Sequence, residues 1–142
     1  MIFVEDLTKL EDEVVAIETD LEARKYSITL IIDGGGSAIT TGEKGHLEIP
    51  FKCEIERATL LADVSGDIVV NIWKSTYADF PPVVGGKITA DAPPTLDGAQ
   101  KSQDATLTGW TKTINAGDIL AFNVDSAATV TRVTLALKVK KI

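Results

Sequence analysis

The stretch Phe3–Arg24, FVEDLTKLEDEVVAIETDLEAR, carries the helical periodicity of the chain. Its apolar residues recur with the strict spacing 4, 3, 4, 3, 4. This spacing is a heptad seam, which helices bury against one another rather than against a sheet. It predicts an N-terminal coiled-coil helix that serves as an assembly stalk. The predicted oligomerisation residues are Phe3, Leu7, Leu10, Val14, Ile17 and Leu21.

The heptad positions favour more than two helices in this stalk. With Phe3 at d, Leu7 and Leu21 occupy a positions and Ile17 occupies a d position. Leu at a with Ile at d shifts a coiled coil from dimers to trimers or tetramers, so we expect a homotrimer. The alternative is an amphipathic helix packed on its own β domain, although such a helix normally presents a wider apolar stripe. The e and g positions are acidic and offer no interhelical salt bridges in a parallel assembly; they include Asp6, Glu11, Glu13, Glu18 and Asp20.

Charge is unevenly distributed along the 142 residues, which carry a net charge of −7. Residues 1–25 hold eight acidic and three basic side chains, so most of the negative charge lies in the predicted helix. An acidic chain without a basic stripe argues against nucleic-acid binding. The sequence has neither an apolar run of membrane-spanning length nor the pattern of a signal peptide, so we expect no membrane insertion and no export by a visible signal.

After the helix, the sequence predicts short strands separated by turns. Residues 63–67 (DVSGD) and 126–128 are predicted as tight turns, and 92–104 as a long polar loop. Many short strands at this spacing are typical of a sandwich or barrel. We therefore expect a mainly β fold, a jelly-roll-like antiparallel β-sandwich over residues 26–142, preceded by one coiled-coil helix over residues 1–25. The predicted strands are 26–33, 46–50, 52–62, 68–74, 87–90, 106–114, 119–124 and 130–139.

The inventory of catalytic residues is poor. The single histidine, His46, has no cysteine or second histidine near it in sequence, and Ser65 does not lie in a nucleophile elbow. Asp63 and Asp67 flank a Ser-Gly pair, where aspartate typically bonds the backbone of a turn. Cys53 is expected to be a small apolar core residue. We expect no enzyme activity, no catalytic residue, no metal site and no cofactor.

Aromatic residues gather around the junction that follows the strand 68–74. Flat aromatic faces with polar groups nearby suit stacking against sugars. The alternative for Trp73 and Trp110 is packing in the core or between subunits, whereas Tyr77 and Phe80 stand in a Pro-bounded loop and are better placed for exposure. The predicted ligand-binding residues are Trp73, Tyr77, Asp79, Phe80 and Trp110.

Three long stretches cover most of the β region: PFKCEIERATLLADVSGDIVVNIWKSTYADFPP (50–82), APPTLDGAQKSQDATLTGW (92–110) and INAGDILAFNVDSAATVTRVTLALKV (114–139). They resemble a β domain found at the C-termini of bacteriophage and prophage tail or virion proteins. The resemblance implies a virion-surface or fibre-tip module made in the cytoplasm of a bacterial host. It supplies no set of functional residues, and the heptad stretch lies outside it.

Together these observations lead to two functional expectations. The first is a homotrimeric bacteriophage fibre or tail-tip protein that attaches non-covalently to a host-surface glycan or protein, since three weak sites on one particle give avidity. Other virion proteins would then contact the N-terminal end of the stalk. The alternative is a purely structural virion component, such as a head fibre, decoration or tail spacer protein, that binds no receptor.

Overall fold

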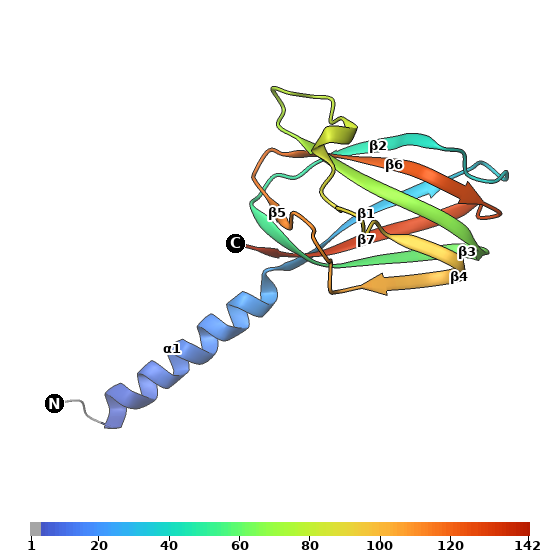
Figure 1. The fold of residues 1–142 in the computed structure, drawn as a ribbon. Helices are drawn as coiled ribbons and strands as arrows, with labels where there is room; N and C mark the ends of the chain where they lie inside the picture. Colours follow the sequence, from blue (N-terminus) through green and yellow to red (C-terminus); the bar gives the residue numbers. More distant parts are fainter. Residues whose placement is uncertain (1–3) are drawn as a thin grey trace.

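The computed structural model describes the backbone of residues 4–142, and the side chains in that range except those of residues 5 and 21–23. One helix precedes a β body, as Figure 1 shows, so the prediction of a mainly β fold with an N-terminal helix is confirmed. The elements are α1 (Val4–Ala23), β1 (Lys25–Asp33), β2 (Gly42–Glu48), β3 (Cys53–Ser75), the 3-10 helix η1 (Val84–Gly86), β4 (Thr95–Asp104), β5 (Thr113–Ile114), β6 (Ile119–Ala128) and β7 (Arg132–Lys141).

Strand β3 is the centre of the body and is 23 residues long. Its first half pairs antiparallel with β7, its second half pairs antiparallel with β6, and β4 lies along the opposite edge of both halves. Because β6 and β7 follow one another in the chain, together they form one long partner for β3. In the same way, β1 pairs with the far edge of β7 and β2 with the far edge of β6. All seven strands therefore belong to one antiparallel sheet.

The sheet curls over at the middle of β3 (Figure 1). The chain segments that change direction there are held together, since Gly34 and Ile39 donate backbone hydrogen bonds to Thr131 and Val130. The curl turns the inner faces of the two halves toward a shared core. Two separate sheets of a sandwich are not confirmed, because one strand runs through both halves. Core residues from the two halves include Leu60, Ile72, Phe122, Leu135 and Leu137.

The prediction of a tight turn at residues 63–67 is wrong, because β3 continues through this segment. The Asp63 carboxylate accepts hydrogen bonds from the Thr131 hydroxyl and from the backbone N–H groups of Thr131 and Arg132. Aspartate is favoured in turns because it bonds nearby backbone groups. Here it bonds the backbone of the β6–β7 connection instead, so the same residue type stabilises a bend in a continuous strand.

Gly66 allows the β6–β7 connection to come close to β3 at this bend. A Cβ atom at this position would lie 2.7 Å from the carbonyl oxygen of Ala128 and 2.8 Å from Cγ2 of Val130. These contacts are shorter than carbon atoms tolerate, so a side chain would force the two segments apart. The glycine in DVSGD is therefore required by packing between segments rather than by a turn.

Other predicted boundaries differ for related reasons. The predicted loop 92–104 contains the edge strand β4, which pairs with β3 through backbone groups and buries only Leu96 completely. The predicted turn 126–128 is the end of β6, and the chain turns at Thr129, where φ is 76°. The predicted strand 106–114 is reduced to β5, and the predicted strand 87–90 to a bridge between Lys87 and Trp73.

The bonds to Asp63 make the stability of the body depend on pH. The pKa of Asp63 lies below its ordinary value of 3.8, chiefly because its carboxylate accepts a hydrogen bond from the Thr131 hydroxyl. Desolvation opposes this shift, and hydrogen bonds from backbone N–H groups add to it. A carboxylate with a lowered folded-state pKa stabilises the fold above about pH 4, and this contribution is lost as the pH falls through the folded-state value.

We therefore expect Asp63→Asn to lower the thermal midpoint at neutral pH and to flatten the loss of stability below about pH 4. Thermal denaturation followed by circular dichroism over a pH series measures both effects. Asp91→Asn removes an exposed carboxylate elsewhere in the chain and should change neither quantity. An equal fall in midpoint in both variants would contradict the assignment.

Candidate functional site

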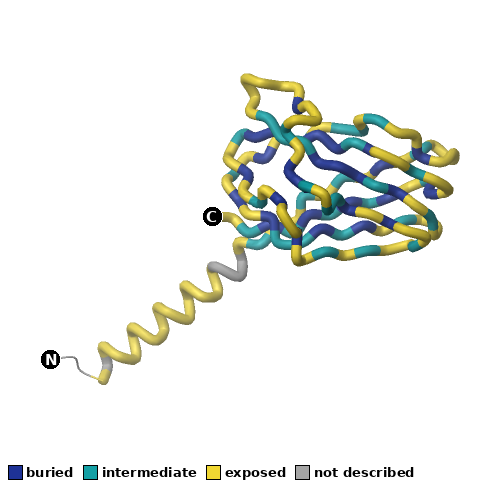
Figure 2. Tube along the Cα trace, in the orientation of Figure 1, coloured by how far each residue is buried: buried dark blue, intermediate teal, exposed yellow. Residues whose placement is uncertain are grey.

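The surface of α1 is the first candidate site. The described seam residues Leu7, Leu10, Val14 and Ile17 are between 47% and 60% exposed. Figure 2 shows the described residues of the helix exposed to solvent along its length, clear of the β body. Phe3 and the side chain of Leu21 lie outside the described residues. The described part of the seam is thus an uncovered apolar stripe, so the alternative of a helix packed on its own β domain does not match the structure.

Two further apolar side chains of the helix are exposed outside the seam. Val4 and Val15, outside the a and d positions, are 78% and 60% exposed. A shallow groove runs along this side of the helix, bordered by Glu11 and Glu18. Near the end of the helix, Arg24 forms a 2.8 Å ion pair with Asp20 one turn earlier. The surface therefore offers apolar contacts in the middle and negative charge at its borders.

The energetics of α1 favour a partner for this stripe. A helix that stands free in water gains little stability from its backbone alone. Fully burying one Val, Leu or Ile side chain contributes about 1.5–3 kcal/mol. Four described seam residues are exposed to water, so burying them against a partner would stabilise the helix.

The two tryptophans of the predicted ligand site belong to the body. Trp110 is 7% exposed, and its indole N–H donates a 2.8 Å hydrogen bond to the carbonyl oxygen of Ala92. Trp73 is half-buried, and its indole nitrogen is buried without an acceptor among the described residues. Packing in the body, the alternative that the sequence left open, therefore describes Trp110.

Tyr77, Asp79 and Phe80 lie together in the loop that follows β3. Tyr77 is 81% exposed and Phe80 is 48% exposed. The Phe80 ring meets the ring of His46 on β2 edge-on, with 5.0 Å between centroids. The structure thus places three of the five predicted ligand residues in one loop and adds His46. This neighbour could not be predicted from the sequence, because His46 is far from the loop along the chain.

Asn71 and Cys53, both on β3, have structural roles. Asn71 is buried and accepts a 2.6 Å hydrogen bond from the Thr89 hydroxyl, while its amide nitrogen donates to Asp125 at 3.0 Å. Cys53 lies in the core as predicted, and burial raises the pKa of its thiol, which disfavours the reactive thiolate. Both side chains therefore serve the fold rather than a ligand site.

A β-bulge moves Arg57 away from the position that simple alternation predicts. The sequence alternation places Arg57 on the same face as Cys53 and Ile55, which are buried. The pairing of β3 with β7 shifts by one residue between Ile55 and Arg57, so Ala58 takes the buried position and Arg57 reaches the outer face. There it joins Lys138, a proximity that no sequence pattern indicated.

Among the side chains that the structure describes, no group of three or more His, Cys, Asp or Glu could hold a metal ion. Within residues 4–142, no helix is both long and apolar enough to cross a bilayer.

No protein-family model and no curated protein matches the chain. Among solved structures, a CBM4 structure is similar at 13% identity and a TM-score of 0.37, covering 82% of this chain and 84% of that one. The coat protein of Tobacco streak virus is similar at 12% identity and a TM-score of 0.31, covering 83% and 86%. The capsid of cyanophage Pam1 is similar at 13% identity and a TM-score of 0.25, covering 83% and 82%. Likenesses of this size assign no function to the chain.

Because Trp110 is buried and Tyr77 is exposed, substituting them should change stability by very different amounts. We expect Trp110→Ala to lower the free energy of unfolding by about 3–5 kcal/mol, because it empties a buried site. Tyr77→Ala should change it by less than about 0.5 kcal/mol, because the side chain is exposed. Urea denaturation followed by fluorescence and circular dichroism measures both values. A large loss in the Tyr77 variant would show that the loop packs more tightly than the structure indicates.

Proposed function

We propose that this protein is a structural component of a virion that assembles as a homotrimer through α1. The observation that carries the proposal is the exposed apolar stripe of Leu7, Leu10, Val14 and Ile17 on a helix that stands clear of the body. Leu at a positions with Ile at a d position supports three helices rather than two. The resemblance of residues 50–139 to bacteriophage virion domains supports the setting.

In a parallel three-helix arrangement, the three bodies lie together at one end and the helix N-termini at the other. The N-terminal end would then be available to other virion proteins. The acidic borders of the stripe repel one another in such a trimer, and salt screens exposed charges. Association is therefore expected to strengthen as ionic strength rises. The proposal includes no enzymatic step and no cofactor.

Sedimentation analysis of the full chain tests this assembly. We expect the wild type to be trimeric at micromolar concentration, and the double variant Leu10→Glu, Ile17→Glu to be monomeric, because each change places a charge in the seam. Thr8→Glu with Ala16→Glu makes the same charge change at positions outside the seam and should remain trimeric. A monomeric wild type with a helical circular dichroism signal from α1 would overturn the proposal.

A second candidate function is attachment to a host-surface receptor, and the exposed loop favours it. Tyr77 and Phe80 present exposed aromatic surface in the same loop as the acidic residue Asp79, a combination that suits a glycan. Three such loops on one trimer would bind a repetitive surface with avidity even when each site is weak. The two functions are compatible, since attachment requires the assembly.

A glycan array and binding to host cells test attachment. We expect reproducible binding by the wild-type trimer and a loss of at least about tenfold in apparent affinity for Tyr77→Ala, because each trimer loses three contacts. Val84→Ala truncates another exposed apolar side chain in the same loop and should bind normally. Absence of binding by the wild type would leave the purely structural role as the function.

A further inference from the structure

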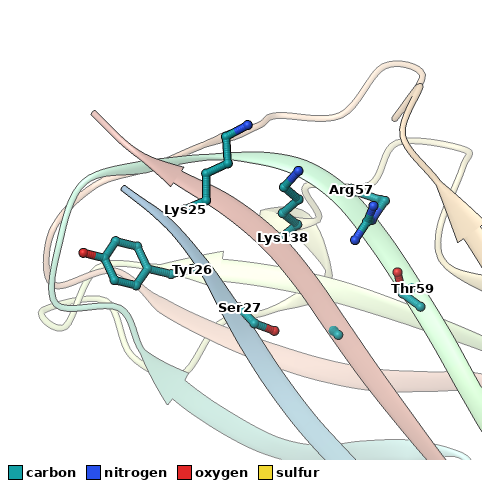
Figure 3. Close-up of a pocket in the computed structure, with 7 residues that line it drawn as sticks. Lys25, Tyr26, Ser27, Arg57, Thr59 and Lys138 are labelled. Atoms are coloured by element: carbon teal, nitrogen blue, oxygen red, sulfur yellow. The ribbon is translucent and has the colours of Figure 1, made fainter. Parts of the chain in front are cut away.

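The outer face of the sheet carries a basic pocket close to the end of α1. Its volume is about 250 Å³, and its cationic lining residues are Lys25 on β1, Arg57 on β3 and Lys138 on β7. Figure 3 shows these three side chains rising from three neighbouring strands on one side of the sheet. Tyr26 also lines the pocket, but its ring points away from the three cations (Figure 3).

Strand register brings the lining residues together. Lys138 is the cross-strand partner of both Ser27 and Arg57. Two residues along β7, Ala136 is the partner of Thr29 on one side and Thr59 on the other. The small side chain of Ala136 leaves a hollow between longer neighbours, so it forms the floor of the pocket.

Two of the three cations of the pocket have no ion pair among the described side chains. Lys25 Nζ lies 3.9 Å from Glu56 Oε1. Arg57 and Lys138 form no ion pair with a described side chain, and Arg57 Nε is buried without an acceptor among the described residues. In Figure 3 the Arg57 guanidinium bends back toward Lys138, which places two like charges near each other. Adjacent like charges cost free energy, which a bound anion would offset.

A hydroxyl group completes the set of donors. Thr59 Oγ1 accepts a 3.1 Å hydrogen bond from Gln103 Nε2, which leaves the Thr59 O–H group to donate. In Figure 3 this hydroxyl points to the same side of the sheet as Arg57. A guanidinium, an ammonium and a hydroxyl group therefore surround one small hollow, and all three are hydrogen-bond donors.

We propose that this pocket binds a single phosphate group. Arginine offers paired N–H donors that match two oxygens of a phosphate, while lysine and hydroxyl donors serve the remaining oxygens. An extended nucleic acid needs a continuous track of cations, whereas this chain has a net charge of −7 and an acidic helix beside the pocket. The site goes beyond the proposed assembly and does not depend on it, since all its residues come from one chain.

Titration of the full chain with inorganic phosphate and with glycerol 3-phosphate tests the site. Calorimetry measures the affinity, and two-dimensional NMR locates the residues whose amide signals move. We expect saturable binding with shifts centred on Ser27, Thr59 and Lys138. Equal affinities assign recognition to the phosphate group alone, and tighter binding of the ester adds contacts to its carbon skeleton; both support the site. Absence of saturable binding overturns it.

Three variants separate a built pocket from general attraction between charges. Arg57→Gln should weaken phosphate binding about tenfold, because it removes a charge-assisted pair of hydrogen bonds. Ala136→Leu changes no charge but fills the hollow, and it should weaken binding as well. Lys101→Gln makes the same charge change as Arg57→Gln on the adjacent strand β4, outside the pocket, and should bind as the wild type does. Equal losses in the Arg57 and Lys101 variants would overturn the proposal.

Two further measurements control for unfolding and for changes in assembly in these variants. Thermal denaturation shows whether Arg57→Gln is folded, and Lys138→Gln replaces it if it is not. Sedimentation shows whether the variants change the oligomeric state. If the wild type ignores phosphate but Arg57→Gln alters assembly, carboxylates of a second copy occupy the pocket and the phosphate proposal is wrong.

Discussion

The Asp63 carboxylate fixes the bend of the sheet through three hydrogen bonds. It accepts them from the Thr131 hydroxyl and from the backbone N–H groups of Thr131 and Arg132. Strand β3 can bend there only if its partner on one edge also changes direction at that point, and the connection 129–131 provides this break. Gly66 keeps the two segments in contact. The inner faces of both halves can then bury a common core, so the hydrophobic free energy of the body depends on this small polar junction.

The curl also gives the body two different outer faces. On the half formed by β2, β6 and the end of β3, Phe80 of the long loop packs against His46, and Ala121 is fully buried. On the half formed by β1, β7 and the start of β3, Ile31 and Leu61 remain 61% and 50% exposed. The chain covers one face with its own loop and leaves the other open. The basic pocket lies on the open face, near the helix.

Local sequence pattern was sufficient to predict α1 from its heptad spacing, β1 from its run of β-branched and apolar residues, and β7 from an alternation in which one face is buried. Pattern-based prediction failed at residue types that occur in more than one structural setting. Asp63 and Gly66 are turn residues by type, but here they serve a bend whose partner is 68 residues away, and no local pattern carries that information. The polar strand β4 is held by backbone pairing that side chains do not reveal. The placement of the site residues could not be predicted for the same reason. The exposure of Tyr77, the burial of Trp110 and the outward position of Arg57 all depend on tertiary contacts.

The way α1 joins the body determines how the molecule carries tension. The helix leads directly into β1, and the Lys141 N–H donates a 2.9 Å hydrogen bond to the carbonyl oxygen of Arg24 where the two meet. From there β1 runs across the body away from the helix, paired with β7 from Lys25 to Asp33 (Figure 1). Antiparallel hydrogen bonds lie perpendicular to their strands. A pull between the helix and the far end of the body therefore shears all of these bonds together instead of unzipping them one by one, so the joint resists mechanical force well beyond the strength of any single contact.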